Sequence, residues 1–272
     1  MANDRLHLSC SGCEMLAGQV LPLLGVAAPD PKPLAPGFLL EGSEGALQFS
    51  ENHKSAMQRA EDETNREMDE QPFQSTFGLN KGKRPYVNYT YGELTALTVS
   101  HVLSAITAAS APGPAERVKK VCDLGCGTGG ILLAARMSLG PEVKLWGGDV
   151  MGSYVRQAEK ALKAFGADST LVVGDFCDEA NLGWRDSDVV MVASTMYEPV
   201  LMADITRLWA EVAQEGSWIV TLDKTVEGPG VERVAEIEGQ GSWGKCRVVL
   251  HRKRAGWKGI DGRGTEGVVT KW

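Results

Sequence analysis

A strand, a glycine-rich turn and a helix follow one another in residues 118–139, which read VKKVCDLGCGTGGILLAARMSL. The apolar run over 118–124 is typical of a strand buried on both faces. The turn Gly125-Cys126-Gly127-Thr128-Gly129-Gly130 permits positive φ and lets a ligand approach the main chain closely. A helix is predicted over 131–139, so the turn lies at a helix N-terminus, where α/β proteins bind nucleotide-like ligands.

The turn fits two cofactor classes, and a residue beside it favours one of them. Gly125, Gly127 and Gly130 satisfy the dinucleotide pattern GxGxxG, in which a pyrophosphate rests on the helix N-terminus. Asp123 stands two residues before the first glycine, where its carboxylate would repel a pyrophosphate. The same carboxylate can accept a hydrogen bond from the ammonium group of a methionine moiety. The sequence therefore favours S-adenosylmethionine, and a dehydrogenase is the least favoured alternative.

Two more carboxylates follow predicted strands. Asp149 ends the second strand, where a carboxylate can accept both ribose hydroxyls; it could instead be a helix N-cap. Asp175 follows the third strand and is expected to accept from the adenine amino group, with Phe176 stacked on the ring; a plain turn residue is the alternative. The expected cofactor-binding residues are Asp123, Gly125, Gly127, Thr128, Gly129, Asp149, Val150, Asp175, Phe176 and Ser194.

Helical and strand patterns alternate through the rest of the chain. Helices are predicted over 94–106, 131–139, 153–165 and 203–214, and strands over 118–124, 143–150, 170–173, 188–193 and 217–222. Two further strands, 231–238 and 246–251, have no helix between them and predict a C-terminal antiparallel hairpin. The pattern therefore indicates an α/β fold: a doubly wound, mostly parallel, seven-stranded, Rossmann-like sheet.

Charge is polarised along the 272 residues. The net charge is −7, the pI about 5.3 and the mean hydropathy −0.15, which are ordinary for a globular protein and disfavour nucleic-acid binding by the whole surface. Residues 1–80 hold five Lys and Arg against twelve Asp and Glu, whereas residues 245–272 hold eight against two. We therefore expect an acidic, proline-containing leader or lid over 1–80 that is partly flexible, a catalytic domain over 81–254 and a basic tail over 255–272.

The leader and the cysteines add three expectations. A polar helix is predicted over 55–69, with too few apolar residues for a strong core-facing stripe. Cys10 and Cys13 form a CxxC without a second ligand pair, so no metal is expected. No signal peptide and no apolar run of about 20 residues is seen, so an intracellular location without a membrane anchor is expected.

Five segments together carry a family resemblance. They are Tyr91-Gly92-Glu93, the turn that begins at Asp123, Gly174-Asp175-Phe176, residues 193–199, and Ser242-Trp243-Gly244. In these segments the chain resembles the histone lysine methyltransferases of the Dot-one type (disruptor of telomeric silencing), a branch of the seven-strand methyltransferases. The resemblance spans about residues 86–254. The turn is shared across the whole superfamily, and the Tyr-Gly-Glu element narrows the match.

The resemblance implies S-adenosylmethionine as cofactor and adds site residues. Tyr91 and Glu93 are implied to close the pocket and contact the methionine end, while Tyr197 and Trp243 are implied to line the substrate channel. From the residues alone, Tyr91 fits a helix-entry turn equally well, and Tyr197 and Trp243 fit core packing. Where the family has Asn-Asn-Phe, this chain has Ala193-Ser194-Thr195, which removes polar and aromatic walls of the channel.

Several functions remain open at this point. Methyl transfer from a sulfonium needs in-line positioning and a desolvated amine rather than a dedicated base. Methylation of a protein lysine is favoured, with a histone or nucleosome as partner and the nucleus as location. The alternatives are a cytoplasmic methyltransferase for a small molecule or a non-histone protein, and a catalytically weak cofactor-binding module. A DNA amino-methyltransferase is disfavoured because no Asn/Asp-Pro-Pro-aromatic element follows the fourth strand. The basic tail would contact nucleic acid only indirectly, or is simply solvated.

Overall fold

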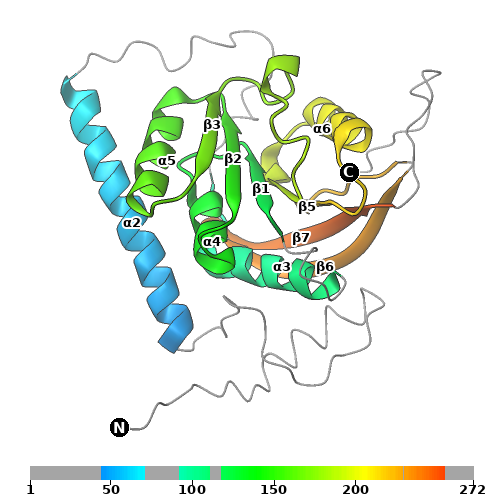
Figure 1. Cartoon of the computed structure of the whole chain (residues 1–272), viewed down its shortest axis with the longest axis horizontal. Coiled ribbons are helices and arrows are strands. Elements are labelled where there is room, and N and C mark those ends of the chain that lie inside the picture. Colours follow the sequence, from blue (N-terminus) through cyan, green and yellow to red (C-terminus); the bar gives the residue numbers. More distant parts are fainter. Residues whose placement is uncertain (1–43, 71–91, 111–117, 229, 255–272) are drawn as a thin grey trace.

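The structure, a computed structural model, describes residues 44–70, 92–110, 118–228 and 230–254. Side chains are described for all of these residues except 60–70. Seven strands form one sheet in the order β3-β2-β1-β4-β5-β7-β6 (Figure 1). The strands are β1 (Lys120–Leu124), β2 (Lys144–Asp149), β3 (Ser169–Val173), β4 (Val189–Val192), β5 (Trp218–Leu222), β6 (Val231–Gly241) and β7 (Gly244–Lys253). β1 to β5 are parallel, and β7 pairs antiparallel with both β5 and β6. The predicted parallel sheet and terminal hairpin are confirmed.

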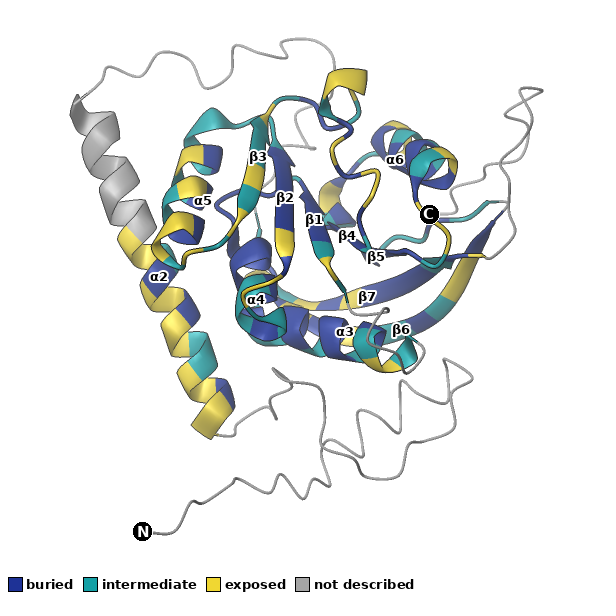
Figure 2. Cartoon of the chain, in the orientation of Figure 1, coloured by how far each residue is buried: buried dark blue, intermediate teal, exposed yellow. Residues whose placement is uncertain are grey.

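Helices cover both faces of the sheet. They are α2 (Glu44–Glu70), α3 (Ala96–Ala109), α4 (Gly130–Leu139), α5 (Gly152–Ala164) and α6 (Pro199–Val212). The side chains of each strand alternate between the two faces, so β4 sends Val189 and Met191 to a core shared with α3 and α4, and Val190 and Val192 to a core shared with α6. The central strands β1, β4 and β5 are accordingly buried almost throughout, whereas the edge strands β3 and β6 also carry exposed residues (Figure 2).

Most element boundaries lie within a few residues of the predictions, and α6 shows why one differs. Helix was expected from residue 203, but α6 begins at Pro199, which occupies its first turn. Proline is well tolerated there because its missing N–H would have no partner in the helix anyway. A proline that looks like a helix breaker in the sequence is therefore a helix start.

The N-terminal helix differs most from its prediction. α2 starts eleven residues before the expected position and spans 27 residues. It packs against α5, α3 and α4. Ala46, His53 and Ala56 are buried, while Phe49 and Met57 pack on the core of α3 and α4. The sequence does not reveal this buried face of α2 because Ala46, His53 and Ala56 are not strongly hydrophobic. The small alanine side chains allow α2 to approach its neighbouring helices closely.

None of the helices in the described ranges combines the length and apolar character needed to cross a membrane.

Candidate active site

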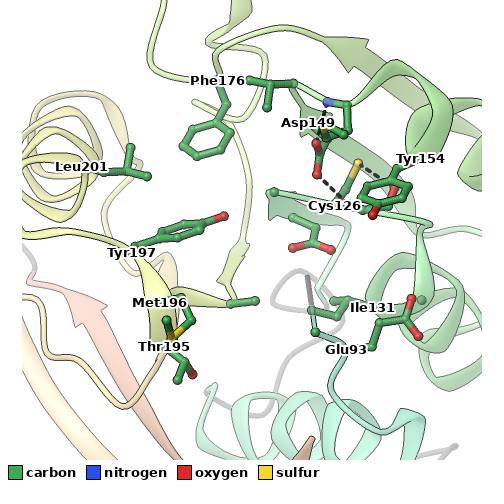
Figure 3. A pocket seen from close by; sticks show the side chains of 18 of the residues that line it. Glu93, Cys126, Ile131, Asp149, Tyr154, Phe176, Thr195, Met196, Tyr197 and Leu201 are labelled. Atoms are coloured by element: carbon green, nitrogen blue, oxygen red, sulfur yellow. Dashed lines mark hydrogen bonds between the residues drawn. The ribbon is translucent and has the colours of Figure 1, made fainter. Parts of the chain in front are cut away.

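A cavity of about 280 Å³ opens at the carboxyl ends of β1, β2, β3 and β4. Parallel strands bring these ends to one edge of the sheet, which is where α/β folds bind ligands. Side chains from both halves of the sheet face each other across it: Phe176, Tyr197 and Leu201 on one side, Glu93, Ile131 and Tyr154 on the other (Figure 3). The lining residues are Gly92, Glu93, Asp123, Gly125, Cys126, Gly127, Gly130, Ile131, Asp149, Val150, Met151, Tyr154, Asp175, Phe176, Ala193, Thr195, Met196, Tyr197, Leu201 and Trp243.

The glycine turn forms the floor of this cavity and is held by main-chain contacts. Its first two amides, of Gly125 and Cys126, both donate to the carbonyl of Gly148, at 2.8 and 3.1 Å. The amide of Gly127 donates to Oδ2 of Asp149 at 2.9 Å. The turn is therefore tied to the neighbouring strand β2 along most of its length.

Gly125 is required both by its conformation and by a neighbour. Its φ is +88°, and a Cβ at this position would lie 2.0 Å from the hydroxyl oxygen of Tyr197. That hydroxyl donates to the carbonyl of Leu124 at 2.9 Å, so it cannot move away without losing its bond. No side chain fits at position 125 while Tyr197 keeps this place.

We expect Gly125→Ala to weaken S-adenosylmethionine binding about 100-fold, because the displaced Tyr197 or the displaced turn would narrow the cavity. Isothermal titration calorimetry measures the affinity. Gly140→Ala is the matched control: Gly140 also has positive φ, +93°, but nothing lies within 4 Å of its Cβ position. That variant carries the backbone strain, about 1 kcal/mol, without the clash. Equal affinities of the two variants would contradict the argument.

Asp123 has an unusual environment. It is 1 % exposed, and no residue in the described ranges forms a hydrogen bond with its Oδ1 atom. Burial, and then the negative charges of Asp149 and Glu93, raise the pKa of this carboxyl well above its ordinary value. A buried carboxylate without a partner is costly. A ligand with a cationic group that bonds Oδ1 of Asp123 would explain why a carboxyl group is buried here.

Asp149 and Asp175 line the cavity and also make local bonds. Asp149 accepts from the amides of Gly127 and Met151, at 2.9 and 2.8 Å, so it braces the turn and the start of α5 together. Burial raises its pKa, and these bonds oppose the rise. Asp175 accepts from the amide of Cys177 at 2.9 Å, as expected of a turn residue. The N-cap of α5 is Met151, so the helix-cap alternative for Asp149 is wrong, whereas the turn alternative for Asp175 is observed. Their contacts with the cofactor stay predictions.

Two segments of the family resemblance, far apart in the sequence, are adjacent in the structure. The carbonyl of Glu93 accepts from the amide of Ser242 at 2.8 Å, and the amide of Glu93 donates to the Ser242 hydroxyl at 3.2 Å. The Glu93 carboxylate accepts from the Thr128 hydroxyl and lies beside Gly130 at the start of α4. The tip of the β6–β7 hairpin therefore positions Glu93 at the cavity. Tyr91 lies outside the described residues.

Tyr197 and Trp243, the predicted channel residues, both line the cavity. Tyr197 is buried, and its ring stacks with that of Phe176 at 6.4 Å between centroids. Burial raises the pKa of its phenol well above the usual value, so it stays protonated. Trp243 is 42 % exposed, so core packing does not describe it, and its ring covers Gly92. Phe176, for which stacking on the adenine ring is predicted, also lines the cavity.

Three predicted cofactor residues do not line the cavity. Ser194 is buried, and its hydroxyl donates to the carbonyl of Leu222 and accepts from the Leu222 amide, so its side chain joins β5 instead of facing a ligand. In this structure the Ser194 hydroxyl therefore has a structural role, and a cofactor contact by this residue stays a prediction. Thr128 donates to Glu93, and Gly129 packs closely on Ala158 of α5, so these two turn residues contact the elements around the turn rather than the cavity.

Other lining residues were missed by the sequence reasoning. Met151 and Tyr154 follow Asp149 into the first turn of α5, and their place directly after a strand that ends in a carboxylate could have indicated them. Met196 and Leu201 follow β4 and carry no comparable signal. Within 44–70, 92–110, 118–228 and 230–254, no group of three His, Cys, Asp or Glu residues could hold a metal ion, and Cys10 and Cys13 lie outside these ranges.

Comparison with known proteins finds a family match for part of the chain. Residues 121–215 match the family described as a methyltransferase domain. No curated protein matches the sequence. Among solved structures, TrmN from Thermus thermophilus is 19 % identical with a TM-score of 0.44, over 57 % of this chain and 48 % of TrmN, so the match spans about half of that protein. TehB from Haemophilus influenzae is 16 % identical, TM-score 0.40, over 50 % and 57 % of the two chains. Precorrin-6y C5,15-methyltransferase from Geobacter metallireducens GS-15 is 16 % identical, TM-score 0.37, over 50 % and 82 %.

Proposed function

We propose that this chain is a class I methyltransferase that uses S-adenosylmethionine, as the methyltransferase match of residues 121–215 supports, and that the acceptor of the methyl group is the side-chain amine of a lysine in a protein. The observation that carries the proposal is the combination of an acidic cavity with an apolar and aromatic mouth. Both features suit a cationic side chain that must lose its proton before it reacts.

The residues of the cavity fit the cofactor. Oδ1 of Asp123 is buried and has no hydrogen-bond partner in the part of the chain that the structure describes, and the negative charge of Glu93 acts on the same carboxyl group. These two carboxylates would hold the ammonium group. Asp149 would accept the ribose hydroxyls, and Asp175 with Phe176 would hold the adenine. When bound, S-adenosylmethionine supplies an electrophilic methyl group on a positively charged sulfur.

The charge of the cavity disfavours phosphate-bearing acceptors. It is lined by four carboxylates, of Glu93, Asp123, Asp149 and Asp175, and none of the described lining residues is Lys, Arg or His. A nucleic-acid backbone would be repelled there, whereas a lysine ammonium would be attracted. The ammonium and sulfonium groups of the bound cofactor would offset the negative charge of these carboxylates. The protonation state of the acceptor lysine would then depend mainly on how far its amine is buried.

The mouth supplies that burial. Tyr197, Met196 and Trp243 line it, and Met196 and Trp243 are each more than two-fifths exposed. An amine that enters between apolar walls loses water, and desolvation lowers the pKa of a lysine toward neutrality. The protonated phenol of Tyr197 cannot act as the base. The apolar side chains of the mouth would instead favour the neutral, nucleophilic lysine amine by excluding water from it.

The finer assignment rests on the Dot-one resemblance. It would make the acceptor a histone lysine, the partner a nucleosome and the location the nucleus. The adjacency of Glu93 and Ser242 supports this proposal, because the two elements that distinguish the resemblance act as one unit. The basic tail, which would add an indirect nucleic-acid contact, lies outside the described residues.

The test is methyl transfer from radiolabelled S-adenosylmethionine to three samples in parallel: core histones, nucleosomes, and a cell extract separated by size. We expect acid-stable label on lysine of a protein, and label on histone would support the finer assignment. Label confined to small molecules would contradict the lysine proposal. Cofactor binding in calorimetry with no transfer to any sample would instead identify a binding module.

A further inference from the structure

One polar side chain interrupts the buried stripe of α2. The stripe consists of Ala46, Phe49, His53, Ala56 and Met57, at the three- and four-residue spacing of one helix face. His53 is 7 % exposed and lies in the middle of this face. A buried imidazole costs free energy unless its polar atoms are bonded, so its partner is informative.

That partner belongs to the cofactor cavity. Nε2 of His53 lies 2.8 Å from the carbonyl oxygen of Gly130, a residue that lines the cavity and begins α4. Because a carbonyl only accepts, Nε2 carries the hydrogen and donates. Burial lowers the pKa of His53, so the imidazole is neutral at physiological pH and can hold this tautomer. A helix 77 residues earlier in the sequence thus bonds the end of the glycine turn.

The turn needs such support from outside. Gly125, Gly127 and Gly129 all have positive φ, and glycines lose more conformational freedom on ordering than any other residue. Gly129 is the N-cap of α4 and provides no side-chain cap. The start of α4 therefore lacks the local bond that usually fixes a helix N-terminus.

α2 supports the turn by two routes. The direct route is the bond from His53 to Gly130. The indirect route runs through α5, against which α2 packs: Ala158 of α5 lies so close to Gly129 that a Cβ there would be 2.8 Å from the Ala158 Cβ. α2 lies alongside α5 in Figure 1, so displacement of α2 would remove the His53 bond and the packing that supports α5 from outside.

We propose that His53 is a positioning residue of the cofactor site, and that docking of α2 and binding of S-adenosylmethionine are thermodynamically coupled. The inference uses the cofactor assignment but is independent of the acceptor. Coupling is reciprocal: an α2 that holds the turn raises cofactor affinity, and a bound cofactor that orders the turn holds α2 more firmly.

The test compares S-adenosylmethionine binding by calorimetry in the full-length chain and its variants. His53→Leu keeps an apolar side chain of similar size but removes the donor, and we expect affinity to fall about fivefold. His53→Gln places an amide N–H where Nε2 stands and should restore affinity to within twofold. Met57→Ala is the comparison variant on the same face: it weakens the packing of α2 but keeps the bond from His53, so it should lower the melting temperature and reduce affinity by less than twofold, clearly less than His53→Leu does.

Hydrogen exchange provides a second readout. In the wild type, S-adenosylmethionine should slow exchange in α2 around His53, and in His53→Leu this protection should disappear. An affinity of His53→Leu within twofold of the wild type, or a His53→Gln as weak as His53→Leu, would overturn the proposal. If His53→Leu does not fold, His53→Asn, whose amide is too short to reach Gly130, takes its place against His53→Gln. A wild type that binds no S-adenosylmethionine contradicts the cofactor assignment itself, which the first titration reveals.

Discussion

Asp123→Asn is expected to weaken S-adenosylmethionine binding by about 10- to 100-fold and, at the same time, to make the free protein more stable. The affinity falls because a hydrogen bond to a charged group contributes about 1.5–3 kcal/mol. The stability rises because asparagine removes the charge of a buried carboxyl group that also faces the negative charges of Asp149 and Glu93. Burial of an uncompensated charge costs more free energy than burial of a neutral amide. Calorimetric titration and chemical unfolding measure the two effects.

The gain in stability should depend on pH with a defined sign. The pKa of Asp123 is raised in the folded state, so between its unfolded value, 3.8, and its folded value the folded protein binds more protons. Wild-type stability therefore falls as pH rises through this window, and the advantage of Asp123→Asn should grow from about pH 4 toward neutrality. Burial lowers the pKa of His251 to about 4, so protonation of this imidazole also destabilises the folded protein in acid. This effect is the same in both proteins, so it cancels in the difference between their stabilities.

Asp149→Asn is the matched control for this prediction. Both oxygens of Asp149 accept from main-chain amides, of Gly127 and Met151. An asparagine can replace only one of these acceptors, so affinity and stability should both decrease. Opposite stability effects at two neighbouring carboxylates would show that Asp123 is held in place for a ligand. A less stable Asp123→Asn, or one with unchanged affinity, would refute the assignment.

Tyr197→Leu should slow methyl transfer by about 100-fold while S-adenosylmethionine still binds. Tyr197 faces the cavity from the loop after β4, and its flat ring stacks with Phe176 and excludes water from the mouth. Leucine is apolar but cannot fill the same wall, so water reaches the amine and its alignment loosens. Rates with the protein acceptor found in the transfer experiment give kcat and KM, and we expect the loss mainly in kcat.

Tyr197→Phe separates the ring from the hydroxyl. This variant keeps the wall but loses the bond to the Leu124 carbonyl, at a cost of about 1 kcal/mol in stability. If the ring is what matters, its transfer rate stays within about threefold of the wild type. A Tyr197→Phe as slow as Tyr197→Leu would instead assign the role to the hydroxyl and contradict the wall argument.

The parts of the site that sequence reasoning found share one property. Asp123 and Asp149 lie at the carboxyl ends of predicted strands and Asp175 comes just after one, and parallel strands necessarily bring these ends to one edge. Local pattern was therefore enough to gather them. Ser194 also follows a strand, but its hydroxyl is bound to Leu222 of β5. Whether a strand-end side chain faces the cavity or the neighbouring strand depends on main-chain geometry, which residue type does not reveal.

The sequence by itself determined the sheet with its terminal hairpin and the carboxylates at its edge, because hydrophobic periodicity and glycine spacing are local properties. Only the tertiary structure decided which distant segments complete the site. Ser242 holds Glu93 from 149 residues away, His53 bonds Gly130 from 77 residues away, and the Tyr197 hydroxyl lies where a Cβ of residue 125 would be. Such pairs arise from how elements pack against one another, and periodicity within one element carries no information about its partner.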